Sequence, residues 1–253
     1  MLTCFTRDVG PALGDCELTH APRQSVDVEK ARTQHAAYED ALRALGAHVE
    51  RLSPAPRAPD GVFVEDTALV LPEVAVILRP GAPSRRPETK SVAKALGAFR
   101  ELRTVRSPGT IDGGDVLRVK MKLFVGRSSR TNADGIDQLS TVVAEFGYQV
   151  FPVGIRECLH LKSAVTQIGP NLLLVNRDWL LDFPFGDMEM IDVDPDEPAA
   201  ANALMINGTA IYPDNFPATA ERMRRSGVRL AAVDVSEIQK AEGGVTCCCI
   251  PLW

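Results

Sequence analysis

Three kinds of residue in this sequence could together perform nucleophilic chemistry: a run of cysteines near the C-terminus, a histidine and several carboxylates. The run Cys247–Cys249 follows Gly243-Gly244. A cysteine thiolate is a strong nucleophile, and a histidine that titrates near neutrality is its usual proton partner. His160 is the candidate for that partner.

The carboxylates stand in two short motifs. Glu65-Asp66 interrupts an apolar run that otherwise predicts a strand, where carboxylates are uncommon. In the second motif, Asp112 and Asp115 flank two glycines. Carboxylates beside a cysteine raise the pKa of its thiol and oppose thiolate formation. That conflict disappears if the substrate is a cation, and a guanidinium is planar, permanently charged and suited to carboxylate pairs. The combination favours attack by a cysteine on a guanidinium carbon.

Each of these residues also has an ordinary structural explanation. Free cysteine is often buried, so the C-terminal run is also typical of a buried strand in which Cys247 and Cys249 share one face. The segment 112–115 has turn composition, and a lone histidine is more often structural. Composition alone places Arg85 and Arg130 on the solvated surface. A fold that brings these positions together would favour the functional interpretation.

A structural repeat predicts such a fold. Five similar segments begin near Val64, Gly113, His160, Ala203 and Val245, which are 42 to 49 residues apart. A period of this length indicates radial or stacked repetition. The unusual polar residues lie at the starts of the predicted inner strands, and a ring would bring those starts to one central channel.

The predicted elements of each unit follow a ββαβ-like order. The predicted hairpins pair 62–71 with 75–78, 111–117 with 123–126, 160–165 with 172–175, and 201–205 with 210–212. The predicted helices cover 25–45, 87–99, 133–146 and 218–226. WD40 blades have four strands and no helix, so we expect an α/β fold instead, a five-bladed α/β propeller. We expect one domain over residues 1–253, with the N- and C-terminal segments together completing the fifth unit.

Composition excludes several classes of function. The 253 residues are 45% hydrophobic and 24% charged, and the net charge of −5 opposes a nucleic-acid surface. No apolar run predicts a membrane span or a signal peptide. Cys4, Cys16 and Cys158 lack the spacing of a metal site or a disulfide framework. We therefore expect a protein of the reducing cytosol that needs no metal or cofactor and has no nucleic-acid or membrane partner.

The same residues resemble the dimethylarginine dimethylaminohydrolase family of the pentein, or guanidine-modifying, superfamily. Each motif is weak alone, but their collinear combination covers nearly the whole chain and is specific. The matching segments are Phe63-Val64-Glu65-Asp66, Arg79-Pro80-Gly81, Ser84-Arg85-Arg86, Asp112-Gly113-Gly114-Asp115, Arg130-Thr131-Asn132, Leu159-His160-Leu161-Lys162 and Gly243-Gly244-Val245-Thr246-Cys247. The resemblance also implies a five-bladed propeller.

The resemblance implies a role for each site residue. Cys247 would be the nucleophile, His160 the general acid and base, and Asp112 the acidic residue beside that histidine. Glu65 and Asp66 would hold the guanidinium nitrogens. The other implied contacts are Arg85 and Arg130 with the substrate α-carboxylate, Asp60 and Phe63 in the pocket wall, and the backbone carbonyls at Leu18 and Ala241 with the α-amino group. Leu18 would lie in a mobile lid.

The implied reaction hydrolyses a methylated arginine. The thiolate attacks, His160 protonates the departing methylamine or dimethylamine, and water then releases citrulline from an S-alkylthiouronium intermediate. Arginine deiminases and amidinotransferases share the fold but are longer, and a non-catalytic pentein would have no use for these residues. The sequence leaves open the physiological guanidine, the oligomeric state (monomer or homodimer) and the role of Cys248 and Cys249, for which a vicinal disulfide or adventitious zinc binding are alternatives.

Overall fold

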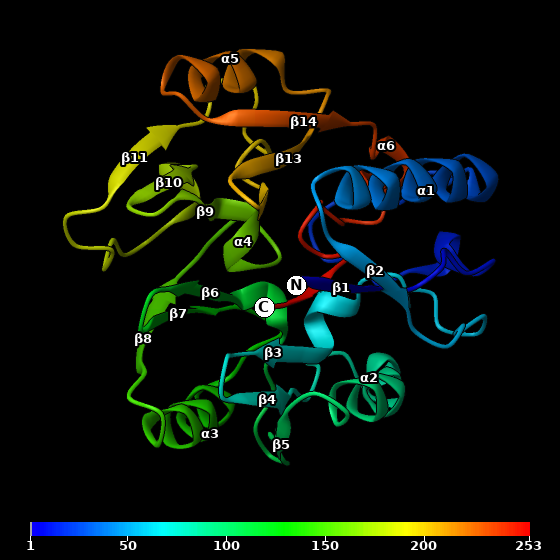
Figure 1. Cartoon of the computed structure of the whole chain (residues 1–253), viewed down its shortest axis with the longest axis vertical. Helices are drawn as coiled ribbons and strands as arrows, with labels where there is room; N and C mark the ends of the chain where they lie inside the picture. Colours follow the sequence, from blue (N-terminus) through cyan, green and yellow to red (C-terminus); the bar gives the residue numbers. More distant parts are fainter. Residues whose placement is uncertain (1) are drawn as a thin grey trace.

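Each of the five predicted units forms a three-stranded sheet in the computed structural model, which describes residues 2–253. The sheets follow one another around a common centre in chain order, with the long helices on the outside (Figure 1). In every sheet the middle strand pairs antiparallel with one neighbour and parallel with the other. The predicted five-bladed α/β propeller is confirmed.

The strands are β1 (Thr3–Thr6), β2 (His48–Arg51), β3 (Ala68–Val70), β4 (Val74–Ile77), β5 (Glu101–Thr104), β6 (Val116–Val119), β7 (Lys122–Arg127), β8 (Gln149–Gly154), β9 (Val165–Gly169), β10 (Leu172–Val175), β11 (Glu189–Asp192), β12 (Leu204–Ile206), β13 (Thr209–Pro213), β14 (Arg229–Val233) and β15 (Ile250–Leu252). The α-helices are α1 (Val28–Ala44), α2 (Thr89–Leu96), α3 (Ala133–Ala144), α4 (Leu161–Ala164), α5 (Pro217–Arg225) and α6 (Ser236–Gln239). The 3₁₀ helices are η1 (Leu13–Asp15), η2 (Val64–Thr67), η3 (Pro83–Glu88), η4 (Gly113–Asp115) and η5 (Arg177–Trp179).

The middle strands β1, β4, β7, β10 and β13 each contain a run of three or more buried residues, which explains why the sequence predicted them well. Their alternating side chains pack on both faces of the sheet: in β4, Val74 and Val76 belong to one hydrophobic cluster, and Ala75 and Ile77 belong to another. The outer strands β2, β5, β8, β11 and β14 are more exposed. A continuous apolar run is typical of a strand that is covered on both faces.

Four of the five units carry a long helix beside the sheet, as predicted. Capping side chains mark two of these helices: Asp27 accepts a hydrogen bond from the Lys30 N–H at the start of α1, and Asn132 accepts one from the Gly135 N–H at the start of α3. Gly46 follows α1 with a φ of +86°, a left-handed conformation that glycine adopts without strain. Between β10 and β11 the described chain has only the short helix η5.

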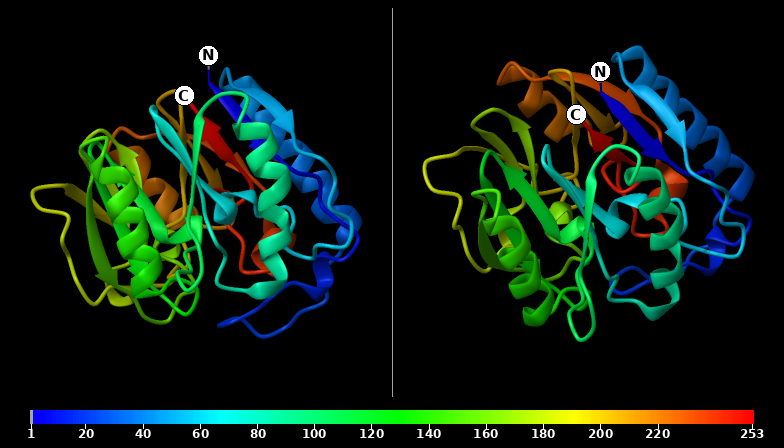
Figure 2. Two further views of the ribbon diagram at one scale, coloured as in Figure 1. Left: turned by 90° about the horizontal axis from the view of Figure 1, so that it is seen from below. Right: turned by 60° about the horizontal axis from the view of Figure 1, so that its bottom comes forward.

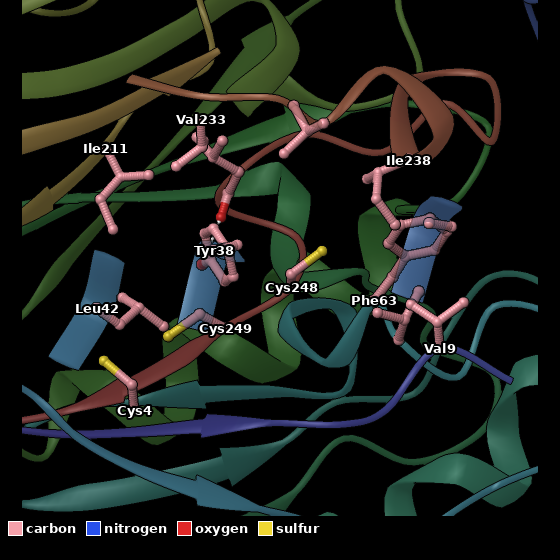
Figure 3. Close-up of a cluster of buried hydrophobic side chains, with 14 of the residues drawn as sticks. Cys4, Val9, Tyr38, Leu42, Phe63, Ile211, Val233, Ile238, Cys248 and Cys249 are labelled. Atoms are coloured by element: carbon pink, nitrogen blue, oxygen red, sulfur yellow. Dashed lines mark hydrogen bonds between the residues drawn. The ribbon is translucent and has the colours of Figure 1, made fainter. Parts of the chain in front are cut away.

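The two ends of the chain complete one sheet together. β1 pairs antiparallel with β15 and parallel with β2, with Thr3 opposite both Leu252 and His48. Cys4, Cys248 and Cys249 pack in the hydrophobic cluster under this sheet (Figure 3). Both termini lie at one end of the ring, whereas the segment after β1, drawn in dark blue, extends toward the opposite end (Figure 2).

Two local predictions were wrong. The cysteine run is not a strand: β15 begins only at Ile250, and the N–H groups of Cys247 and Cys249 donate to the carbonyls of Gly244 and Thr246 in a tight turn. η2, η4 and α4 occupy the same place before β3, β6 and β9, where the sequence predicted extended strand starts. Short apolar runs carry no periodicity that separates a strand from a single helical turn.

Within residues 2–253, no helix has both the length and the apolar character needed to cross a membrane.

Candidate active site

The helical turns that precede the inner strands bring the predicted site residues together. Eight of the eleven predicted residues line one enclosed cavity of about 20 Å³. They are Asp60, Phe63, Asp66, Arg85, Arg130, His160, Ala241 and Cys247. These positions are far apart in the sequence and come from separate units, so the ring is what assembles them.

His160 is held between two carboxylates. Its Nε2 lies 3.1 Å from Oδ2 of the fully buried Asp112, and its Nδ1 lies 3.9 Å from Oδ1 of Asp66. The other Asp112 oxygen accepts a hydrogen bond from the Gly81 N–H. Burial alone would lower the pKa of His160, but the charges of Asp66, Asp112 and Asp115 raise it to about 9. His160 is therefore an imidazolium at neutral pH and can donate a proton.

Cys247 is half-buried and neutral in the free protein. The Gly244 N–H donates to its Sγ at 3.2 Å. Burial first, and then the negative charges of Glu65 and Asp66, raise the pKa of the thiol to about 12. A bound cation would oppose those two charges and favour the thiolate. The pKa values of the buried neighbours Cys248 and Cys249 are also raised, mainly by burial.

Glu65 contacts the backbone of Cys247 and does not line the small cavity. Its carboxylate accepts hydrogen bonds from Lys162 Nζ at 2.6 Å and from Thr246 Oγ1 at 2.8 Å, and it faces a second cavity of about 360 Å³. The Glu65 N–H donates to the Cys247 carbonyl at 3.1 Å. Burial outweighs the Lys162 charge and raises the pKa of Glu65. Its negative charge still reaches the Cys247 thiol.

Arg85 is buried in an acidic pocket. It forms ion pairs with Asp66 and Glu88, and its Nη2 also donates to the carbonyls of Asp60 and Phe63. One N–H of Nη1 has no partner among residues 2–253. Burial opposes ionisation of Asp66, but the charges of His160 and Arg85 outweigh it and hold the pKa of this carboxyl below its usual value. Asp66 therefore carries a full negative charge beside the cavity.

The segment between β1 and α1, residues 10–27, covers the cavity; we call it the lid segment. The Glu17 N–H donates to both oxygens of Asp60, at 3.2 and 3.3 Å, and Arg130 Nη2 donates to Thr19 Oγ1. Burial raises the pKa of Asp60 to about 6. Leu18 is half-buried in this segment, where it packs on the hydrophobic cluster of the fifth unit and does not line the small cavity.

Comparison with known proteins agrees with this arrangement. The profile of a family described as "N,N dimethylarginine dimethylhydrolase, eukaryotic" matches residues 19–183. The chain is 35% identical over 232 residues to the N(G),N(G)-dimethylarginine dimethylaminohydrolase of Pseudomonas aeruginosa, covering 91% of both chains. It is 38% identical over 249 residues to the enzyme of that name from Streptomyces coelicolor, covering 98% of this chain and 96% of that one. The chain belongs to the dimethylarginine dimethylaminohydrolase family.

Solved structures show the same fold. The P. aeruginosa family member, as a cysteine-to-serine mutant complexed with citrulline, superposes with a TM-score of 0.94 at 33% identity over the full length of both chains. A family member in which a histidine is replaced by glycine, as an adduct with S-methyl-L-thiocitrulline, gives 0.93 at 33% identity over the same coverage. The N-terminal domain of a cyanobacterial arginine dihydrolase gives 0.86 at 17% identity, which shows a shared fold alone.

The DGGD motif of this family member depends on its glycines for close packing. A Cβ at Gly113 would lie 1.9 Å from the backbone oxygen of Glu65, and one at Gly114 would lie 2.6 Å from Nδ1 of His160. The following Asp115 is fully buried, where it accepts hydrogen bonds from the Leu161 N–H and from two hydroxyl groups. The motif therefore fixes the backbone around His160. The pair of adjacent glycines was the sequence signal from which this close packing could have been predicted.

Several supporting residues were missed by sequence reasoning. Glu88 neutralises Arg85, Lys162 neutralises Glu65, and Asn202 joins the His160 turn to the Cys247 turn. Glu88 stands three positions after Arg85 in a short helix, a weak signal for an ion pair. Asn202 carried no local signal, because its partners are 40 and 44 positions away in the sequence.

Asp66, Asp112 and His160 are the residues that could hold a metal ion. Each presents one ligand atom, and these atoms lie within 4.8 Å of one another. Arg85 already neutralises Asp66, and the Gly81 N–H occupies one oxygen of Asp112. These three side chains already interact with protein groups that suit them to proton transfer. The expected absence of a metal or cofactor stays a prediction.

Proposed function

We propose that this protein is a dimethylargininase that hydrolyses Nω-methylated arginine, both asymmetric dimethylarginine and monomethylarginine, to citrulline and dimethylamine or methylamine. The observation that carries the proposal is the pairing of a neutral thiol, Cys247, with a charged imidazolium, His160, in a cavity lined by Asp66, where the charge of Glu65 also reaches the thiol. The names of its relatives, and the citrulline and thiocitrulline bound in their solved structures, support the substrate class.

The reaction begins when the substrate guanidinium enters beside Asp66. Its charge offsets those of Glu65 and Asp66 and lowers the pKa of the Cys247 thiol, which releases its proton to solvent because His160 is already protonated. The thiolate then attacks the guanidinium carbon. The C–N bond to the methylated nitrogen then breaks, and His160 gives its proton to the departing amine. An S-alkylthiouronium remains on the sulfur.

Neutral His160 performs the second half of the reaction. It takes a proton from a water molecule, the hydroxyl attacks the same carbon, and the C–S bond breaks to release citrulline and the thiolate. Asp112 keeps the ring in position through its bond to Nε2 and stabilises the imidazolium that forms again. The reaction consumes one water and leaves the sulfur free.

The remaining residues would bind the amino-acid part of the substrate. We assign the α-carboxylate to Arg130 and to the remaining N–H of Arg85, and the pocket wall to Asp60 and Phe63. The carbonyls of Leu18 and Ala241 would accept the α-amino group. The cavity beside Asp66 and His160 measures about 20 Å³, too small for an amino acid, although Cys247 also borders a cavity of about 510 Å³. We propose that the lid segment moves to admit substrate. We further propose one domain and a reducing compartment such as the cytosol, supported by six free cysteines.

The test is to incubate the purified protein separately with asymmetric dimethylarginine and with arginine, and to quantify citrulline, dimethylamine and ammonia. Cys247→Ser is the control. Citrulline with dimethylamine, absent in the variant and with arginine inert, would support the proposal. Ammonia from arginine would instead place the protein with the deiminases, and no turnover of either substrate would favour a non-catalytic binding protein.

A further inference from the structure

Glu242 ties the lid segment to the loop that carries the nucleophile. Its carboxylate accepts hydrogen bonds from three consecutive backbone N–H groups: Thr19 at 2.8 Å, His20 at 2.6 Å and Ala21 at 2.5 Å. Converging backbone N–H groups form an anion-binding concavity, and bonds to a charged acceptor are stronger than neutral ones.

Two other hydrogen bonds also join the lid segment to the C-terminal segment, but at the end next to α1: Lys240 Nζ donates to the Ser25 carbonyl, and the Asp27 N–H donates to Glu237. The remaining bonds of the lid segment lead elsewhere. The Glu17 N–H bonds Asp60, Thr19 Oγ1 accepts from Arg130, and Arg23 donates to two carbonyls within the segment itself. Glu242 stands five positions before Cys247 and lines the small cavity together with it. Its φ of +56° is left-handed, which is unusual for a residue other than glycine.

The position of Glu242 relates it to both carbonyls assigned to the α-amino group. It follows Ala241 directly in the chain, and the Thr19 N–H that it accepts belongs to the same peptide group as the Leu18 carbonyl. That peptide is trans, so its N–H and C=O point in opposite directions. Fixing the N–H therefore fixes the direction of the Leu18 carbonyl.

We propose that Glu242 is a positioning residue: it closes the lid segment over the bound substrate and orients the carbonyls of Leu18 and Ala241 toward the α-amino group. This rests on the proposed function. Glu242 acts through the backbone of residues 19–21 and takes no part in the bond-breaking steps. Its loss should weaken recognition of the α-amino end of the substrate and leave the attack on the guanidinium carbon intact.

The test compares two substrates, monomethylarginine and its analogue that lacks only the α-amino group. For Glu242→Ala we expect kcat/KM on monomethylarginine to fall about 10- to 100-fold, the effect of one charge-assisted hydrogen bond, with the change mainly in KM. The analogue should lose much less. Glu242→Gln keeps one acceptor oxygen and should be intermediate. Glu157→Gln is the matched control, because Glu157 lies on a neighbouring cavity wall and makes no hydrogen bond or ion pair within residues 2–253.

A second measurement does not depend on turnover. Arg23 is exposed in the lid segment, so trypsin cleavage after it reports how often the segment opens. Cleavage should be several-fold faster in Glu242→Ala than in the wild type or Glu157→Gln. Equal losses on both substrates, or an unchanged cleavage rate, would overturn the proposal. If the wild type hydrolysed neither substrate, the proposed function would fail while the cleavage rates would still decide whether Glu242 holds the lid segment.

Discussion

Replacement of Asn202 by alanine should both destabilise the protein and slow its reaction. The Asn202 amide donates to the Lys162 carbonyl and to Thr246 Oγ1, both at 3.0 Å, and its oxygen accepts from the Thr246 N–H at 3.1 Å. It is 9% exposed, and the loop at Gly244 packs closely against it. The fourth unit thus links the turn that follows His160 to the turn that carries Cys247.

The size of the effect follows from these contacts. Asn202→Ala removes three hydrogen bonds and leaves the buried Thr246 N–H without its partner. The expected loss in free energy of unfolding is about 2–4 kcal/mol. For a chain of this length that lowers Tm by about 5–15 °C. Thr246 also holds Glu65, so the freed turn should misplace the sulfur and lower kcat about 10- to 100-fold.

Thermal unfolding and steady-state citrulline formation would measure both effects. Asn171→Ala is the matched control: Asn171 makes one long hydrogen bond, to the Asp187 carbonyl at 3.4 Å in an exposed turn, and should leave both quantities near wild type. Asn202→Asp keeps the shape of the side chain but replaces the amide donor by a carboxylate oxygen, which repels the Lys162 carbonyl. It should lower Tm and kcat at least as much as the alanine substitution. An Asn202→Ala protein with wild-type Tm and kcat would refute the linking role.

Three further predictions concern the same site. Alkylation of Cys247 by iodoacetamide, followed by peptide mass spectrometry, should be slow at pH 7 and accelerate toward pH 12, and Asp66→Asn should speed it at pH 7; a rate indifferent to pH would contradict the raised pKa of the thiol. The folded pKa of His160, about 9, exceeds its unfolded value of 6.5, so its contribution of about 3 kcal/mol is complete below pH 6.5 and is lost as the pH rises through 9. Denaturant unfolding at pH 6, 8 and 10 should show this loss in the wild type and a flatter profile in His160→Gln; parallel profiles would count against it. Gly113→Ala should lower the free energy of unfolding by at least about 3 kcal/mol, since its Cβ would meet the Glu65 backbone oxygen, whereas Gly14→Ala, with nothing within 4 Å, should be near neutral in the same thermal assay.

The repeat could be predicted from the sequence because each unit shows a recognisable pattern of apolar strands and turns within its own residues. The middle strands are apolar runs such as Val74–Ile77, and turn residues separate them at a nearly constant spacing. The helical turns before the inner strands could not be predicted, because one turn such as Val64–Thr67 is too short for helical periodicity. Its conformation is set by contacts with other units, such as the bond from the Glu65 N–H to the Cys247 carbonyl.

Site residues could be predicted from the sequence where their residue type is unusual for the segment that contains them. Carboxylates inside an apolar run and a glycine pair between two aspartates are visible in the sequence, and the structure brings these residues around one centre. Asn202 and Glu242 are of ordinary residue types for their own segments. Glu242 lies 221 to 223 positions from the N–H groups that it binds, so only the closed ring reveals what it does.

The charges around Cys247 explain how a buried thiol can be both protected and reactive. With Glu65 and Asp66 nearby and no substrate guanidinium bound, the thiolate of Cys247 is disfavoured, so the free protein should resist alkylation and oxidation, which require that form. In the mechanism that we propose, the charge of a bound guanidinium offsets those of Glu65 and Asp66, so the Cys247 thiolate forms only beside a group that it can attack. A neutral analogue of the same shape, such as a urea, would fill the same space without lowering the pKa of the thiol. Binding of a cationic substrate would thus itself activate the thiol. This property depends on Glu65 and Asp66, two carboxylates in an apolar segment where carboxylates are uncommon.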